Sequence, residues 1–238
     1  MKTVVVYYSK SGNTKTIAET ISHEIGATLI PINIIKKGRK TKEEKELEKQ
    51  YFNQALTESR LADLALIGTP TEFRKPHPKI MDLIDRLETK QVAIFCTYYG
   101  MLGATFYDLE ARLLRKNIIL VDKLNLLIGT EKYKFNQDIS QYKELIKPEH
   151  LQTARQFARN AISQQENLPL RLTGACGKDC SDCPDFNNTC KGAGFECWSG
   201  KDCKIFDCCV IKKSYLTCEE CNNSLNCKMI KEITNNFA

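Results

Sequence analysis

The sequence predicts an α/β domain with a five-stranded parallel sheet and helices on both faces, followed by a small, irregular, metal-stapled domain rich in cysteine. Two observations predict this division. Apolar β-branched runs alternate with helical patterns five times within residues 1–165. All but one of the twelve cysteines lie between Cys176 and Cys227. The stretch 164–169 is polar and ends in a proline, so we expect domains at 1–165 and 170–238.

The expected strands are continuous apolar runs, the pattern typical of strands that are buried on both faces of a parallel sheet. The second and third runs are separated by enough chain for a helix, and the same holds for the later pairs. The runs cover residues 4–8, 28–34, 63–68, 92–96 and 118–121, the last extended by 124–128.

Helical spacing fills the segments between these strands. Ile17, Ile21 and Ile25 recur at helical intervals, with Ala18 beside them. The stretch 41–44 has the pattern of a capping box, and the helix after it places Leu47, Tyr51 and Ala55 on one face. Further helices are expected at 80–87, from about residue 104 to 114, and from Pro148 to about Ser163.

The composition excludes several classes of protein. Hydrophobic residues make up 42% of the 238 residues, which is enough to bury a core and excludes a wholly disordered chain. No apolar run approaches the ~18 residues that a membrane span needs. The apolar stretch at the start is too short for a signal peptide. We therefore expect a cytoplasmic protein without a membrane partner.

The loop after the first strand predicts an anion site. Its hydroxyls and backbone N–H groups lie where a helix begins, and the helix dipole favours a phosphate there. Gly12 allows the backbone to turn tightly. An ordinary capped strand–helix turn explains these residues equally well when they are taken alone. The candidate phosphate-binding residues are Ser9, Lys10, Ser11, Gly12, Asn13 and Thr14.

Two aromatic loops follow later strands and should meet the first loop at the carboxyl edge of the sheet, where ligands of such sheets bind. They span residues 68–76 and 97–103. A phosphate loop beside two aromatic loops fits a phosphorylated planar ring, which predicts flavin mononucleotide (FMN). The candidate ring-binding residues are Pro70, Thr71, Glu72, Phe73, Thr97, Tyr98, Tyr99, Gly100 and Gly103.

The run Ser9-Lys10-Ser11-Gly12-Asn13-Thr14 resembles the phosphate-binding signature of flavodoxins, and the likeness extends over roughly residues 1–165. It implies a flavodoxin-like fold, bound FMN, and a role as electron carrier or oxidoreductase. The loop 69–75 departs from many flavodoxins because it contains no glycine. It offers Arg74 and Lys75 instead, which lie either toward the flavin or in solvent.

The tail has too few large apolar residues to build a core without staples. Disulfides fit poorly with a cytoplasmic chain, so metal bound by cysteine is the stronger expectation. Both an iron–sulfur cluster, of the 4Fe-4S type, and zinc fit the spacing. The pattern Cys176-Gly177-x2-Cys180-x2-Cys183-Pro184 also resembles that of small cysteine-rich domains of anaerobic bacteria and archaea that are described as zinc-binding. The candidate ligands are Cys176, Cys180, Cys183, Cys197, Cys203, Cys208, Cys218, Cys221 and Cys227.

Together the two domains predict a redox flavoprotein in which electrons pass between FMN and iron–sulfur clusters in the tail. The alternative is a redox sensor or docking protein whose tail is a structural zinc module. The net charge of +6 lies on the first domain and suits an acidic redox partner. The tail has as many acidic as basic residues, which argues against nucleic-acid binding. A homodimer is compatible with the fold.

Overall fold

The structure is a computed structural model of the whole chain. It describes residues 1–36, 38–100, 102–129, 145–164, 176, 204–213, 218 and 221–229. The predicted domain boundary and four of the predicted metal ligands lie outside the described residues. These four are Cys180, Cys183, Cys197 and Cys203.

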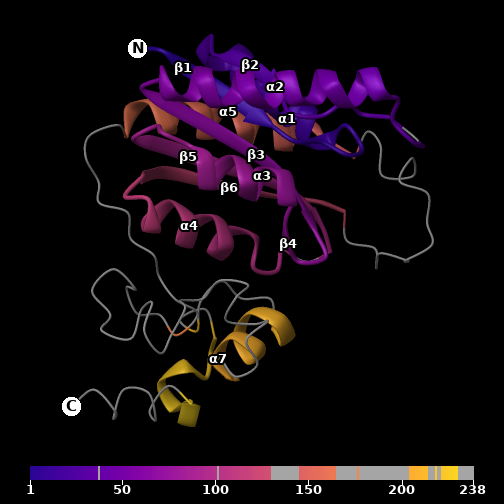
Figure 1. Cartoon of the computed structure of the whole chain (residues 1–238). Coiled ribbons are helices and arrows are strands. Elements are labelled where there is room, and N and C mark those ends of the chain that lie inside the picture. Colours follow the sequence, from indigo (N-terminus) through magenta and orange to yellow (C-terminus); the bar gives the residue numbers. More distant parts are fainter. Residues whose placement is uncertain are drawn as a thin grey trace.

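Five parallel strands form the sheet (Figure 1). They are β1 (Thr3–Tyr7), β2 (Thr28–Pro31), β3 (Leu64–Glu72), β5 (Gln91–Tyr99) and β6 (Ile119–Gly129). Their order across the sheet is β2-β1-β3-β5-β6. Counted along the chain this is 2-1-3-4-5, which is the doubly wound order of flavodoxins. The predicted flavodoxin-like fold is confirmed.

Helices cover both faces of the sheet (Figure 1). One face packs against α1 (Asn13–Ile25) and α5 (Pro148–Ser163) through residues such as Ile17 and Phe157. The other face packs against α2 (Lys42–Arg60), α3 (Pro78–Arg86) and α4 (Thr105–Arg115). In β1, Val4 and Val6 face one layer and Val5 the other, which explains why this strand is a continuous apolar run.

Several predicted bounds differ from the structure. The third strand runs on to Glu72, and a two-residue strand, β4 (Lys75–Pro76), folds back against its end. The strand β6 is continuous across the predicted gap, with a shift in its register against β5. The second strand ends at Pro31, earlier than predicted.

The predicted apolar face of α2 is wrong at Leu47, which is 37% exposed. The inward face carries Ala55 with Phe52 and Leu56. Glu48 also points inward and is only 6% exposed. Its two lysine partners, described below, neutralise a charge that would otherwise be costly to bury. The capping box of Thr41 and Glu44 is present as predicted.

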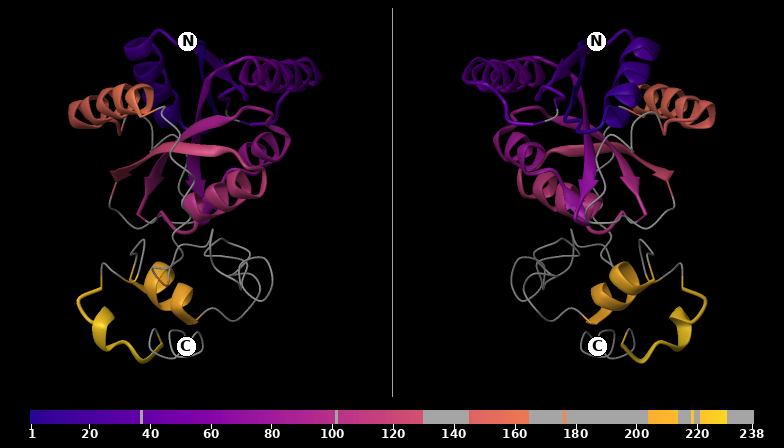
Figure 2. Two further views of the ribbon diagram at one scale, coloured as in Figure 1. Left: turned by 90° about the vertical axis from the view of Figure 1, so that its left-hand side faces the viewer. Right: turned by 90° about the vertical axis from the view of Figure 1, so that its right-hand side faces the viewer.

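The described part of the tail contains three short elements. They are α7 (Lys204–Phe206), the π-helical turn η2 (Asp207–Lys212) and the 3-10 turn η4 (Ser224–Asn226). In both views of Figure 2 these segments lie below the sheet, on the side toward which its strands run. Within the described part of the chain, every helix is too short or too polar to cross a membrane.

Candidate functional site

The first loop forms a cradle of donors at the start of α1. Gly12 precedes the helix with a φ of 104°, a left-handed conformation that a side chain would strain. The backbone N–H groups of Gly12 and Lys15 both donate to the Ser9 hydroxyl, each at 3.2 Å. The start of a helix, with its hydroxyls and backbone N–H groups, favours the oxygens of a phosphate. A Cβ added at Gly12 would meet open space. The cradle therefore fits a phosphate group.

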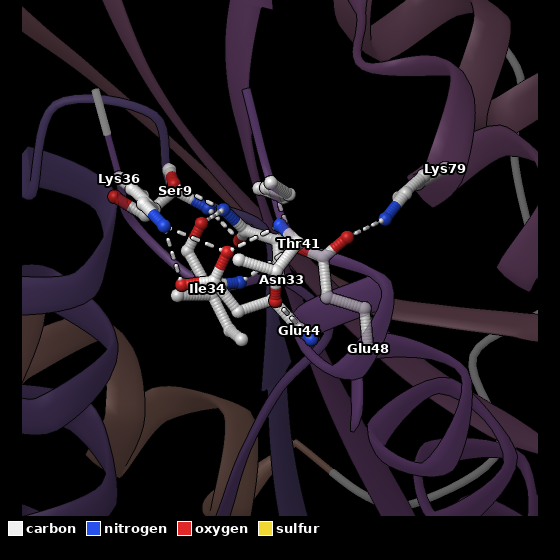
Figure 3. A network of polar contacts seen from close by, with 9 residues as sticks. Ser9, Asn33, Ile34, Lys36, Thr41, Glu44, Glu48 and Lys79 are labelled. Carbon is white, nitrogen blue, oxygen red and sulfur yellow. Dashed lines mark hydrogen bonds and ion pairs between the residues drawn. The ribbon is translucent and has the colours of Figure 1, made fainter. Parts of the chain in front are cut away.

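Asn33, which follows β2, holds the start of this loop (Figure 3). Its Oδ1 accepts from the backbone N–H of Ser9 at 2.9 Å, and its Nδ2 donates to the Ser9 carbonyl at 2.7 Å. Both residues are buried. One side chain thus satisfies both backbone polar groups of Ser9, and no motif in the sequence marks this asparagine.

A buried carboxylate fixes the segment that carries Asn33 (Figure 3). Glu48 accepts from the backbone N–H of Ile34 at 2.7 Å and from Lys79 Nζ at 2.8 Å, and it also pairs with Lys40. Burial raises the pKa of Glu48, but the hydrogen bonds from Lys40, Lys79 and Ile34 outweigh burial and lower it overall. The network ties the loop after β2 to α2 and α3.

Two hydroxyl pairs join the loops to one another. The Thr14 and Thr97 hydroxyl oxygens lie 2.7 Å apart and are buried, which links the first loop to the third. The Thr71 and Thr105 hydroxyl oxygens lie 2.8 Å apart and link the second loop to α4. The predicted meeting of the three loops at the carboxyl edge is therefore present in the structure.

Both polar atoms of the Asn13 side-chain amide make hydrogen bonds. Its Oδ1 accepts from the backbone N–H of Leu145 at 3.1 Å, and its Nδ2 donates to the Ser11 hydroxyl at 3.0 Å. The side chain is buried and orders the rim of the cradle. Lys10, which is exposed, pairs with Glu72 of the second loop at 3.2 Å. That ion pair closes the gap between the first two loops.

The second loop is a tight hairpin between β3 and β4. Its two turn residues, Phe73 and Arg74, have φ values of 50° and 67°. Turns of this kind usually carry Asn or Gly, so the backbone is strained at Phe73 and Arg74. The Arg74 carbonyl accepts from the backbone N–H of Ala104 at 2.8 Å. Phe73 is 64% exposed, which is unusual for so large an apolar side chain in a strained turn.

The third loop has two glycines with different surroundings. Gly103 has a φ of 61°, and a Cβ there would overlap the Cβ and carbonyl oxygen of Arg74. Gly100 has a φ of 76° and faces open space, and its N–H donates to the Gly129 carbonyl at 3.0 Å. A Cβ on Gly129 would overlap the ring of Tyr99, so that ring lies over β6.

His77 is not the exposed loop residue that its position between two prolines suggests. It caps α3 and stacks on Tyr8, with ring centroids 3.5 Å apart. Its Nδ1 accepts from the backbone N–H of Lys79 at 3.2 Å, which only the neutral ring can do. Burial, followed by the charges of Lys79, Lys10 and Lys40, lowers the pKa of His77 to about 4.

Two further titratable groups beside the loops are shifted by burial. Burial, and then the charge of Glu72, raises the pKa of Tyr8 to about 12, so the stack joins two neutral rings at neutral pH. Cys96 is fully buried at the end of the core part of β5, and burial raises the pKa of its thiol. Cys96 therefore belongs to the hydrophobic core.

Five of the predicted metal ligands belong to the described part of the tail, and four of them line one cavity of about 330 Å³. These four are Cys208, Cys218, Cys221 and Cys227, and Cys209 lines the cavity as well. Cys176 lies near enough to Cys218 for its charge, after burial and together with Cys227, to raise the pKa of Cys218. Among the described residues, no three histidine, cysteine or acidic side chains form a group that could hold a metal ion.

The pKa of the Cys221 thiol is lowered, whereas that of Cys218 is raised. The backbone N–H of Asn223, followed by Lys213, lowers the pKa of Cys221. Lys213 Nζ lies 3.2 Å from its Sγ.

Solved structures with a similar fold are known, whereas no family model and no curated protein matches the chain. A flavodoxin, WrbA-like protein from Agrobacterium tumefaciens is 19% identical, with a TM-score of 0.45 over 70% of this chain and 99% of that one. A flavodoxin from the domain Archaea is also 19% identical, with a TM-score of 0.46 over 70% and 100%. A flavoprotein in complex with FMN from Lactobacillus acidophilus is 23% identical, with a TM-score of 0.40 over 52% and 92%.

Proposed function

We propose that the sheet domain binds FMN at its carboxyl edge and that the protein is an electron carrier or oxidoreductase. One observation carries this proposal. Hydroxyls and backbone N–H groups gather at the start of α1, where the N–H groups of Gly12 and Lys15 both donate to the Ser9 hydroxyl, between two loops that offer aromatic side chains. A phosphate and a planar ring are the groups that suit these two parts of the site.

Separate residues serve the two ends of the ligand in this proposal. The phosphate is held by Ser9, Ser11, Gly12, Asn13 and Thr14. Phe73 is the candidate to cover the ring, because it is exposed on a turn that is held rigidly by Ala104. Pro70, Thr71, Thr97, Tyr98 and Gly100 supply the rest of the ring site. Bound FMN would supply the exchange of one or two electrons.

The finer part of the proposal is that electrons pass between FMN and an iron–sulfur cluster in the tail. The number of cysteines in the tail favours this relay, and the described tail lies on the side of the sheet where the loops are (Figure 2). The cysteines that line the described cavity do not by themselves form a group that could hold a metal ion. A tail with structural zinc is the competing function, because zinc takes the same thiolates but has no redox chemistry. The net charge of +6 suits an acidic protein partner, whose electron exchange should slow as salt is added.

The test is a visible spectrum with iron, sulfide, zinc and FMN analysis of full-length protein purified without oxygen. Flavin bands with iron and sulfide support the relay, and flavin bands with zinc alone refute it. The double variant Asn13→Ala, Thr14→Val should lose FMN, since it removes two buried side chains of the cradle. Asn53→Ala on the exposed side of α2 is the matched control. Full FMN content in the double variant would overturn the phosphate assignment.

A further inference from the structure

Basic side chains gather on one flank of the proposed FMN site, between the first loop and the starts of α2 and α3. Lys40 and Lys79 both pair with Glu48. Lys36 pairs at 2.8 Å with Glu44, which lies one helical turn before Glu48. Figure 3 shows Lys36 and Lys79 at opposite ends of this network. We call this surface the basic flank, and its residues are Lys10, Lys36, Arg39, Lys40, Lys42 and Lys79.

The lysines of the basic flank reach the surface, whereas the carboxylates that pair with them lie deeper. In each of the four ion pairs the lysine side chain is more exposed than its acidic partner. The contrast is largest for Lys79 and Glu48, whose side chains are 39% and 7% exposed. Three carboxylates serve the four lysines, because Glu48 pairs with two of them. The surface that the flank presents to solvent is therefore positive.

Arg39 and Lys42 add two positive charges that are not neutralised. Both side chains are exposed, and within the described part of the chain neither makes an ion pair or a hydrogen bond. Glu43 and Glu44 stand among these cations and carry the opposite charge. Such an alternation suits the separate carboxylates of a protein surface better than the unbroken row of phosphates in a nucleic acid.

His77 lies beside the basic flank and responds to its charge. After burial, the charges of Lys79, Lys10 and Lys40 lower the pKa of His77. Glu48 acts in the opposite direction, but its effect is smaller than that of each lysine. Bound FMN would add the negative charge of its phosphate to this edge of the sheet. The surplus of cations would offset that charge and keep the edge attractive to an anionic partner.

We propose that the basic flank is the docking surface for an acidic redox protein, which exchanges electrons with FMN at the adjoining site. Lys10 belongs both to the flank and to the first loop, and it pairs with Glu72 of the second loop, so a partner on the flank lies against the rim of the site. The redox centre of the partner is oxidised as FMN is reduced, or the reverse, so no further reactant is required. The electron exchange rests on the proposed function, whereas the docking depends on the charges of the chain alone.

Reversal of the two unpaired charges tests the proposal without breaking an ion pair. The variant Arg39→Glu, Lys42→Glu should fold, because both side chains are exposed and the first turn of a helix favours an acidic residue at Lys42. The matched control is Lys2→Glu, Lys90→Glu, which changes the net charge equally. These two lysines directly precede β1 and β5, so they lie at the amino edge of the sheet, away from the site.

The first measurement is the binding of a peptide of alternating glutamate and glycine, whose spaced carboxylates imitate an acidic protein surface. It uses the full-length protein at low ionic strength and does not depend on FMN. The flank variant should bind the peptide at least about tenfold more weakly, whereas the amino-edge control should stay within about twofold of the unmodified protein. Equal binding by the two variants would overturn the docking surface. Duplex DNA that stays bound to the unmodified protein at about 0.15 M salt would replace the acidic protein by a nucleic acid as the partner.

The second measurement follows the reoxidation of the reduced protein by ferricyanide, an anion, and by hexaammineruthenium(III), a cation. Two ions of either reagent accept one electron each as FMN returns to its oxidised form with release of its protons. At low salt the flank variant should react about threefold to tenfold more slowly with ferricyanide, and faster with the ruthenium complex. The amino-edge control should change neither rate, and ~0.5 M salt should remove the difference. The same rates in both variants would refute steering by the basic flank.

The two measurements separate this inference from the proposed function. Protein that contains no FMN but binds the peptide through the basic flank would refute the proposed function and support the docking surface. Protein that contains FMN, with equal peptide binding and equal rates in the two variants, would support the proposed function and refute the docking surface.

Discussion

Asn33 bonds to both the N–H and the carbonyl of Ser9, across 24 positions in the sequence. This contact fixes the position of the first loop relative to the edge of the sheet, because Ser9 is the first residue of that loop. Its hydroxyl is also the oxygen on which the cradle donors converge. The shape of the proposed phosphate site therefore depends on a residue that need not touch the phosphate.

The variant Asn33→Ala should weaken both folding and FMN binding. It leaves two buried backbone groups of Ser9 without a partner, which costs about 2 kcal/mol of unfolding free energy. We expect FMN affinity to fall about tenfold or more, a change of about 1.4 kcal/mol. Urea unfolding and fluorescence titration with FMN measure the two effects. Asn53→Ala should change neither quantity, and an unaltered affinity in Asn33→Ala would show that Ser9 needs no anchor.

Phe73→Gly should separate stability from binding. Glycine relieves the positive φ at Phe73 but adds freedom to the unfolded chain, so the free energy of unfolding without FMN should change by less than about 1 kcal/mol. Loss of the ring should weaken FMN binding about threefold to tenfold, the range expected for one aromatic contact. Arg74→Gly relieves the same turn and keeps the ring, so it is the matched control. Equal FMN affinities in the two variants would remove Phe73 from the ring site.

Protonation of His77 should destabilise the protein in mild acid. The pKa of His77 is about 4 in the folded protein and about 6.5 when unfolded, so the unfolded chain binds the extra proton as the pH falls through this window. Stability is lost between about pH 6.5 and pH 4. With screening at this half-exposed ring we expect a loss of about 1 kcal/mol. His77→Asn keeps a capping oxygen, and urea unfolding at pH 7 and pH 4.5 should show a smaller acid loss in it. The same acid loss in both proteins would contradict the assignment.

Two glycines should differ in their response to alanine. Gly103→Ala meets both a positive φ and the backbone of Arg74, so it should cost about 3 kcal/mol of unfolding free energy. Gly12→Ala meets the backbone strain alone and should cost about 1 kcal/mol. Urea unfolding of the protein without FMN compares them directly. A larger cost at Gly12 would mean that the hairpin moves aside easily.

The sequence predicts the sheet and the place of the site because both depend on local patterns. Runs such as 4–8 and 92–96 are apolar on both faces, and the loops after them meet as a consequence of parallel topology. The contacts of Asn33 and His77 could not be predicted, since each depends on partners brought near only by folding. The hairpin at Phe73 was missed because neither turn residue is Asn or Gly.

The grouping of the predicted metal ligands also depends on how the chain folds and could not be predicted from the sequence. The cysteine content predicts a metal-binding tail, but spacing alone leaves many groupings of the cysteines open. Cys209 lines the cavity although it was not among the predicted ligands. It follows Cys208 directly, and the spacing of the cysteines does not show that both line one cavity. The burial of the Glu48 side chain could not be predicted either, since a glutamate on a charged helix is expected to face water.

The pair of Thr14 and Thr97 has a consequence for how the two ends of a ligand could influence each other. Either hydroxyl can donate across the 2.7 Å that separates them. An anion beside Thr14 would accept a hydrogen bond from that hydroxyl, so Thr97 would have to donate to Thr14 and leave its own lone pairs facing the third loop. The direction of the hydrogen bond between Thr14 and Thr97 would then depend on whether an anion occupies the cradle. Riboflavin, which lacks the phosphate, would therefore encounter a third loop with a different dipole from the one that FMN encounters.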